Sequence, residues 1–257
     1  MNPRSRRQAT RPRPQPRASG PWKHGPIPVI GVVGGIGSGK SAVASHLETL
    51  GGFVIDADAV GHALLAQRPV RDEVVARFGP GIVMKVENGS PPIDRRVLAA
   101  IVFRDPKARR DLESILHPRM RRTFERAIAR TVRRGRSKAV VLDAAVLYEA
   151  RWDALCDRVV FVDAPRDLRL ARVEASRGWT DEVLQAREQS QLPFEEKKAR
   201  ADVVVANAGD LAALGAEVTR AWESMRRPAG SVPGARRVVT RPTAAEAAEP
   251  RTPDQDA

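Results

Sequence analysis

One eight-residue stretch constrains the fold of this chain more than any other. It reads Gly34-Gly35-Ile36-Gly37-Ser38-Gly39-Lys40-Ser41 and fits the phosphate-loop pattern G-x-x-x-x-G-K-[ST] at every fixed position. A short β-branched apolar run, 28–33, precedes it and is typical of a buried parallel strand. The stretch 42–50 that follows can form a helix, which Gly51-Gly52 would end. A strand, a glycine loop and a helix in this order predict a phosphate site.

The loop predicts how a nucleotide would be held. Glycines let backbone N–H groups converge on a phosphate because no Cβ stands in the way, and the helix N-terminus adds partial positive charge. We expect Lys40 to reach the β- and γ-phosphates of ATP and the Ser41 hydroxyl to bind Mg²⁺. A ligand-free glycine turn is the alternative, which the agreement of both flanks disfavours. The expected ATP-binding positions are Gly35, Ile36, Gly37, Ser38, Gly39, Lys40, Ser41 and Ala42.

Composition sets the class of protein. The chain has 257 residues, a net charge of +13 and 42% hydrophobic residues, of which few are aromatic, so we expect an aliphatic core. Cys156 is the only cysteine, so no internal disulfide can form, which is compatible with the cytoplasmic location that we expect. No apolar run reaches about 18 residues, and we expect no membrane span. The sequence predicts no particular oligomeric state.

Both ends of the chain differ from its middle. Residues 1–28 contain seven Lys and Arg residues, several prolines and no acid, and 226–257 are rich in Pro, Ala and Arg. We expect both tails to be disordered and 29–225 to form the folded domain. Clustered arginines can bind nucleic acid. A solvated tail is the reading we favour, because aromatic residues for base stacking do not interleave with these arginines.

Acidic residues follow two predicted strands. Asp56 and Asp58 come just after the buried run 53–55, at the strand end where ligands bind in open α/β sheets. One of them could cap the next helix, while the other takes a proton from a hydroxyl or contacts Mg²⁺ through water; we expect both. The apolar run 138–142 ends in Asp143, which resembles the second acidic element of phosphate-loop proteins and would support Mg²⁺ indirectly.

Two helical regions are predicted around this edge. Residues 59–135 show helical periodicity, and we expect a helical insertion that holds the acceptor substrate. Within it, His117 precedes Pro118; a substrate role and a histidine bonded at a proline kink are equally supported. Residues 166–200 are helical and rich in arginine, which favours a lid over the phosphates, although a solvated charged face is the alternative. The lid arginines are Arg166, Arg169, Arg172, Arg177 and Arg187.

These motifs, in this order and spacing, resemble those of bacterial dephospho-CoA kinases over about 29–222. Besides the loop, the resemblance is carried by Ile55-Asp56-Ala57-Asp58, His117-Pro118, Leu147-Tyr148-Glu149, Gln191-Leu192-Pro193-Phe194-Glu195-Glu196-Lys197, and Ala201-Asp202-Val203-Val204 with Asn207 and Gly209. Two departures stand out. Ala42 replaces the family's usual Thr, and the segment 143–149 lacks the family's proline, so contacts there are less well supported.

The resemblance implies a fold and a reaction. It implies an α/β phosphate-loop nucleoside-phosphate-kinase fold with three layers: a five-stranded parallel sheet, a helical CoA-side insertion and a helical lid. It further implies transfer of the ATP γ-phosphoryl group, with Mg²⁺, to the ribose 3′-hydroxyl of dephospho-CoA, the last step of coenzyme A synthesis. Kinases of other nucleotide-like acceptors, such as nucleoside monophosphates, are one alternative, and a nucleic-acid-binding ATPase is another.

The resemblance also assigns roles to residues. Asp58 matches the aspartate that acts on the 3′-hydroxyl, and Lys40 and Arg172 complete the implied catalytic set. Arg177 lies where a lid arginine contacts ATP, and Asn207 lies where the adenine-side loop would be. The implied acceptor contacts are Asp56, Asp58, His117, Leu147 and Glu149.

Overall fold

A five-stranded parallel sheet forms the centre of the molecule in a computed structural model that describes residues 20–84 and 91–228. The strand order is β2-β3-β1-β4-β5, with all neighbours parallel. Because the chain leaves β1 first toward β2 and later crosses it to β4, the loop after β1 lies where the strand order reverses, the usual ligand position in such sheets. The strands are β1 (Val29–Gly34), β2 (Gly52–Asp56), β3 (Ala139–Asp143), β4 (Arg158–Asp163) and β5 (Val203–Ala206).

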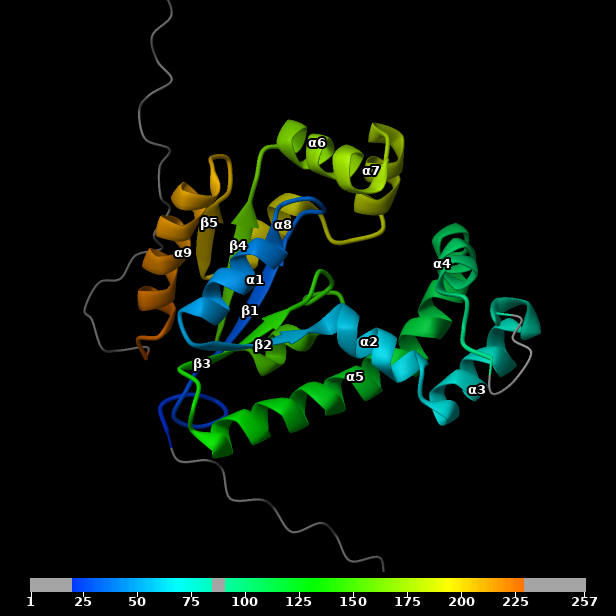
Figure 1. The fold of residues 1–257 in the computed structure, drawn as a ribbon, viewed down its shortest axis with the longest axis horizontal. Coiled ribbons are helices and arrows are strands. Elements are labelled where there is room, and N and C mark those ends of the chain that lie inside the picture. Colours follow the sequence, from blue (N-terminus) through cyan, green and yellow to red (C-terminus); the bar gives the residue numbers. More distant parts are fainter. Residues whose placement is uncertain (1–19, 85–90, 229–257) are drawn as a thin grey trace, which may run out of the picture.

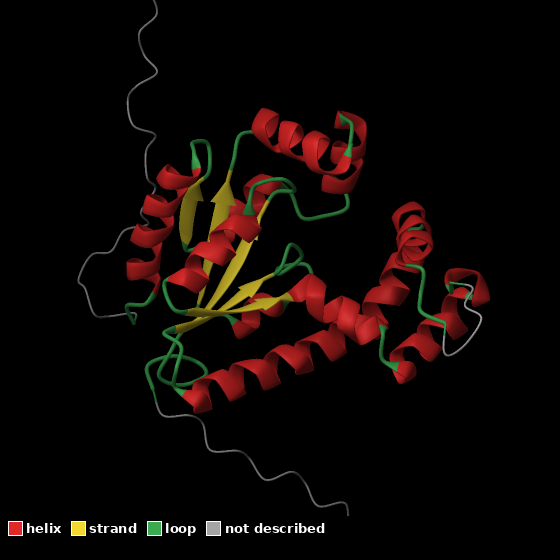
Figure 2. Ribbon diagram, viewed as in Figure 1, coloured by secondary structure: helices red, strands yellow, loops and turns green. Residues whose placement is uncertain are grey.

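Helices cover both faces of the sheet, which confirms the predicted three-layer α/β fold (Figures 1 and 2). Helices α1 (Lys40–Thr49) and α9 (Leu211–Met225) pack on one face. Helices α5 (Pro106–Arg134) and α8 (Phe194–Arg200) pack on the other. Along β1, Ile30 and Val32 enter the first core and Val29 and Val33 the second, the alternation expected of a strand buried on both faces.

The helical insertion extends to one side of the sheet (Figure 1). It contains α2 (Ala57–Leu65), α3 (Arg68–Phe78), a 3₁₀ turn at Pro80–Ile82, α4 (Arg95–Arg104) and the first part of α5, whose remaining part packs on the sheet. Helix starts are set by local sequence, since Asp56, Asp94 and Asp105 each accept a hydrogen bond from the first turn of the helix that follows. Helix α5 continues through Pro118, so the proline does not divide it.

The predicted lid region, 166–200, contains three helices, of which two lie over the strand ends and the third packs on the sheet. Helices α6 (Arg166–Arg177) and α7 (Asp181–Glu188) lie over the carboxyl ends of the strands, and Gly178 separates them with a left-handed φ of 64° (Figure 1). Helix α8 packs against β1 and β4 instead, and Lys197 within it is buried. Only α6 and α7 are therefore positioned above the strand ends as a lid.

The folded domain begins before residue 29, which corrects the predicted boundary. The Trp22 side chain is buried, and the Arg158 guanidinium lies 5.6 Å from its ring centroid. Asp157 accepts hydrogen bonds from the backbone N–H of Lys23 at 2.9 Å and of Val29 at 2.8 Å. Burial of a large aromatic ring outweighs the polar composition around it. The predictions of disorder for 1–19 and 229–257 lie outside the described residues.

Within 20–84 and 91–228, no helix combines the length and the apolar character that crossing a membrane requires.

The single thiol offers a test of the core. Cys156 is buried, its Sγ lies 3.7 Å from the Trp152 carbonyl oxygen that it faces, and burial raises the pKa of the thiol far above its ordinary value. Because the thiolate is the reactive form, we expect native protein to resist a disulfide-exchange reagent at pH 8 and to react only as urea unfolds it. Labelling that follows the circular dichroism transition would support this; rapid labelling of folded protein would contradict it.

Candidate active site

The phosphate loop opens into a cavity of about 380 Å³ at the carboxyl ends of the strands. The loop and α1 contribute Gly37, Lys40 and Ser41 to its wall. The ends of β2 and β3 and the first turn of α2 contribute three carboxylates: Asp56, Asp58 and Asp143. The structure therefore brings the predicted lysine, hydroxyl and acids to one place, although they come from distant parts of the sequence.

The other walls come from the lid and the insertion. Arg177 and Arg187 reach the cavity from the lid, Trp179 lies between α6 and α7, and Phe103 comes from α4. Of these, only Arg177 was predicted as a site residue. Aromatic residues close to arginines in the sequence, such as Trp179 between Arg177 and Arg187, are the signal that could have indicated the others, but sequence alone does not select one lid arginine from five.

The loop conformation requires glycine at two positions. Gly37 and Gly39 adopt left-handed φ values of 76° and 89°. A Cβ on Gly39 would lie 2.2 Å from the Asn207 side-chain nitrogen, so even alanine would displace that amide. No side chain caps α1 at Gly39, which leaves the helix N-terminus available to an anion.

Asn207 and Arg172 brace this loop from behind. The buried Asn207 amide donates to the Ser38 carbonyl oxygen at 2.7 Å. The Arg172 guanidinium donates to the Asn207 carbonyl oxygen at 3.2 Å and to that of Ser38 at 3.4 Å. Arg172 was predicted to be catalytic, but its side chain does not line the cavity with Lys40; backbone carbonyls engage it instead. Its position is that of a residue that orients the loop.

Lys40 and the acids form one electrostatic group. Burial lowers the pKa of Lys40, whereas the nearby charges of Asp143 and Asp58 act to raise it. Burial raises the pKa of Asp143 to about 6, against the opposing effect of Lys40. Asp56 caps α2 by accepting from the Ala59 N–H at 3.0 Å. Asp58, in the first turn of α2, is exposed and is the acid better placed to meet a ligand.

The donor set fits a magnesium ion that arrives with a nucleotide. The Ser41 hydroxyl and the carboxylates of Asp58 and Asp143 line the same cavity, and hydroxyl and carboxylate oxygens are the ligands that Mg²⁺ prefers. In the described part of the chain, no three His, Cys, Asp or Glu side chains group closely enough to hold a metal by themselves. Magnesium commonly binds through one or two protein groups and the substrate phosphates, so this arrangement suits a phosphate-bound ion.

Three predicted acceptor contacts do not line this cavity. His117 packs edge-on against Trp152, with ring centroids 5.0 Å apart, and burial lowers the pKa of its imidazole. Leu147 is fully buried in the core. Glu149 pairs with the buried Lys197 ammonium at 2.7 Å and accepts from the Leu192 N–H at 2.9 Å, which ties α8 to the loop after β3. The positions of these three side chains indicate packing roles.

A second, larger cavity is the less suitable site. It measures about 470 Å³ and lies between Gly35, Ile36 and the segment 185–197 of the lid and α8. Its wall includes the Phe194 ring and the Lys197 side chain, but neither Lys40 nor any of the three aspartates. Phosphoryl-transfer groups converge only on the smaller cavity among the described residues.

The Asp143 carboxyl gives a pH-dependent prediction. Its pKa is higher in the folded chain, so the folded state binds more protons than the unfolded state between about pH 4 and 6. Its contribution to stability therefore falls as pH rises through that window. We expect Asp143→Asn to gain stability relative to the wild type from pH 4 to 6, with a plateau above. Urea unfolding of nucleotide-free protein at each pH measures this; a constant difference would contradict it.

Comparisons with known proteins place the chain in a family. The family model for dephospho-CoA kinase matches residues 28–213. A dephospho-CoA kinase from Symbiobacterium thermophilum is 41% identical over 80% of this chain and 85% of its own length. Another, from Anaeromyxobacter dehalogenans, is 40% identical over 77% and 92%.

Solved structures agree with these sequence matches. TT1252 from Thermus thermophilus superposes with a TM-score of 0.64 at 34% identity, covering 77% of this chain and 98% of its own. Dephospho-CoA kinase from Campylobacter jejuni has a TM-score of 0.58 at 25% identity, covering 77% and 96%. The sequence match, the sheet order and the phosphate-loop cavity agree, and the chain belongs to the dephospho-CoA kinase family.

Proposed function

We propose that this chain transfers the γ-phosphoryl group of ATP to the ribose 3′-hydroxyl of dephospho-CoA, the last step of coenzyme A synthesis. The observation that carries the proposal is that Lys40 and Asp58 line the same cavity. The chain also belongs to the dephospho-CoA kinase family. An Asp58 carboxylate on the far side of the sheet from Lys40 could not take part in such a transfer. ATP use and a lone buried thiol are compatible with a cytoplasmic location, which forms part of the proposal.

The donor half of the site holds the ATP phosphates. The loop amides and the N-terminus of α1 contact the β- and γ-phosphates, and Lys40 supplies a cation beside them. Phosphate binding would counter the burial that lowers the pKa of Lys40 and so stabilise its charged form. Ser41, with Asp143 acting indirectly, would hold Mg²⁺, which when bound neutralises charge on the phosphate oxygens. Arg177 contacts the phosphates from the lid, while Arg172 and Asn207 keep the loop in shape.

The acceptor half activates the hydroxyl. Asp58 orients the 3′-hydroxyl toward the γ-phosphorus and accepts its proton as the new P–O bond forms, while the bond from the γ-phosphorus to the β,γ-bridging oxygen breaks and ADP leaves. Asp56 is less suited to this role, because its carboxylate already accepts the Ala59 N–H. Most of the acceleration then comes from positioning and from charge stabilisation, as is general for phosphoryl transfer.

An ATP-consumption assay distinguishes this proposal from its rivals. We expect turnover with dephospho-CoA and much less with AMP, CMP or single-stranded DNA. A nucleoside monophosphate kinase would respond to AMP or CMP, and a nucleic-acid-dependent ATPase would respond to DNA. Removal of 1–19 and 229–257 keeps Trp22 and its contacts, and the shortened protein should retain kinase activity. Turnover with DNA that disappears on this removal would favour the ATPase.

Replacement of Asp58 tests the acceptor role directly. We expect Asp58→Asn to lower turnover by about 10²-fold or more while ATP affinity stays the same, because the amide cannot accept the proton. Asp72→Asn is the matched control, since Asp72 is an exposed acid that pairs with arginines on α3. Lys40→Ala should instead weaken ATP binding. Turnover by the variant and its ATP affinity, determined by calorimetry, give the measurements. Wild-type turnover in Asp58→Asn would show that Asp58 does not have this role.

A further inference from the structure

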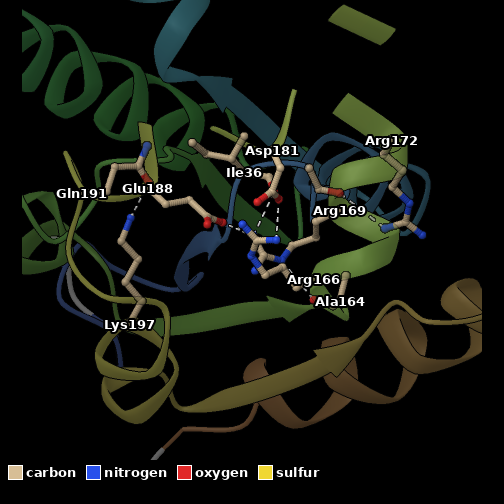
Figure 3. Close-up of polar contacts among 10 residues, drawn as sticks. Ile36, Ala164, Arg166, Arg169, Arg172, Asp181, Glu188, Gln191 and Lys197 are labelled. Atoms are coloured by element: carbon tan, nitrogen blue, oxygen red, sulfur yellow. Dashed lines mark hydrogen bonds and ion pairs between the residues drawn. The ribbon is translucent and has the colours of Figure 1, made fainter. Parts of the chain in front are cut away.

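The lid arginines differ in what already engages them. Arg166 pairs with Asp181 at 2.5 Å, and Arg169 pairs with Glu188, so lid acids neutralise both (Figure 3). Arg172 is held by backbone carbonyls behind the phosphate loop. Within 20–84 and 91–228, no carboxylate lies within ion-pair distance of Arg177 or Arg187, and these are the lid arginines that line the cavity.

The described residues leave both a hydrogen-bond donor and the charge of the Arg187 guanidinium without full stabilisation. Its Nε is buried and has no hydrogen-bond acceptor among the described residues. Burial lowers the pKa of this guanidinium, and the neighbouring Arg177 charge lowers it further. A buried donor without a partner and a repelled charge both carry a free-energy cost, which an anion in the cavity would relieve. The side chain is therefore prepared for an anionic ligand.

Two aromatic rings hold the Arg187 guanidinium in place. It lies 4.1 Å from the Trp179 ring centroid and 4.8 Å from that of Phe103. Trp179 belongs to the lid, whereas Phe103 belongs to α4 of the insertion and is 44% exposed. Cation–π contacts with both rings fix the guanidinium plane without consuming its hydrogen-bond donors. Arg187 thus bridges the lid and the acceptor-side insertion.

The two lid arginines without a carboxylate partner share the Trp179 ring but differ in their other neighbours. The charge of Arg177 is among those that lower the pKa of Lys40, so Arg177 lies within electrostatic reach of the phosphate loop. Arg187 contacts Phe103 on the insertion and so lies nearer the acceptor end. The donor triphosphate would meet Lys40 and the loop amides, which leaves Arg187 available to a second anion.

We propose that Arg187, bracketed by Trp179 and Phe103, binds the 5′-diphosphate of the acceptor nucleotide and selects acceptors that carry it. This rests on the proposed function, because dephospho-CoA carries such a diphosphate on the ribose whose 3′-hydroxyl reacts. A guanidinium suits the task, since it can donate two parallel hydrogen bonds to phosphate oxygens.

The test separates acceptor binding from donor binding. We expect Arg187→Gln to weaken dephospho-CoA binding by about 10- to 100-fold, the usual effect of losing a charge-assisted contact, while the Kd for ATP stays within about twofold. The preference for dephospho-CoA over adenosine, which lacks the diphosphate, should shrink by a similar factor. Calorimetry with each ligand and kcat/KM for both acceptors give the measurements.

Two further variants guard against an effect on folding. Phe103→Ala removes an exposed side chain, and we expect a smaller loss of dephospho-CoA affinity, about 3- to 10-fold, with ATP binding unchanged. Arg130→Gln removes an exposed positive charge from α5, outside both cavities, and should match the wild type. Protection of Cys156 from labelling reports that each variant is folded.

The outcomes are distinct. Equal losses of ATP and dephospho-CoA affinity in Arg187→Gln would assign Arg187 to the donor phosphates and overturn the proposal. Unchanged affinity for both would show that the guanidinium only packs between the rings, and would also overturn it. A wild-type enzyme that does not phosphorylate dephospho-CoA would instead remove the proposed function, and that result is seen before any variant is made.

Discussion

The hydrogen bond from the Asn207 amide to the Ser38 carbonyl oxygen is the contact on which the site depends. It joins the loop after β5 to the phosphate loop and occupies the space where a Cβ on Gly39 would stand. The left-handed Gly39 backbone then directs the chain into α1, so that the helix N-terminus and Lys40 face the cavity. A loop held by its neighbours before ATP binds loses less entropy on binding.

Acids and lid arginines reach this cavity from different elements of the fold. Acids come from the ends of β2 and β3 and from the first turn of α2, and arginines come from the lid. This separation suits a reaction in which a hydroxyl is activated on one side and phosphate charge is neutralised on the other. Asp143 is costly to ionise, because burial removes water from its carboxyl and the charges of Asp56 and Asp58 raise its pKa further.

Local patterns in the sequence were sufficient to predict the helices and strands around the site, and the part of the site that the phosphate loop and the acids form. The phosphate loop after the first strand and the acids at the ends of two further strands lie where the sequence predicts them, because each pattern depends on residues a few positions apart. The predicted start of the domain was wrong, because the buried Trp22 ring packs against Arg158, which lies more than a hundred positions away in the sequence.

The sequence by itself determined a parallel α/β fold, a phosphate-binding loop and the acids that would face it, since strand ends and glycine turns impose these directly. Only the tertiary structure decided the uses of the remaining side chains. It placed His117 on Trp152, Leu147 in the core and Glu149 on Lys197. It also engaged Arg172 behind the loop and left Arg187 facing the cavity. The physical reason is that a side chain's partners come from elements distant in the chain, and a charge pattern along one helix does not encode them.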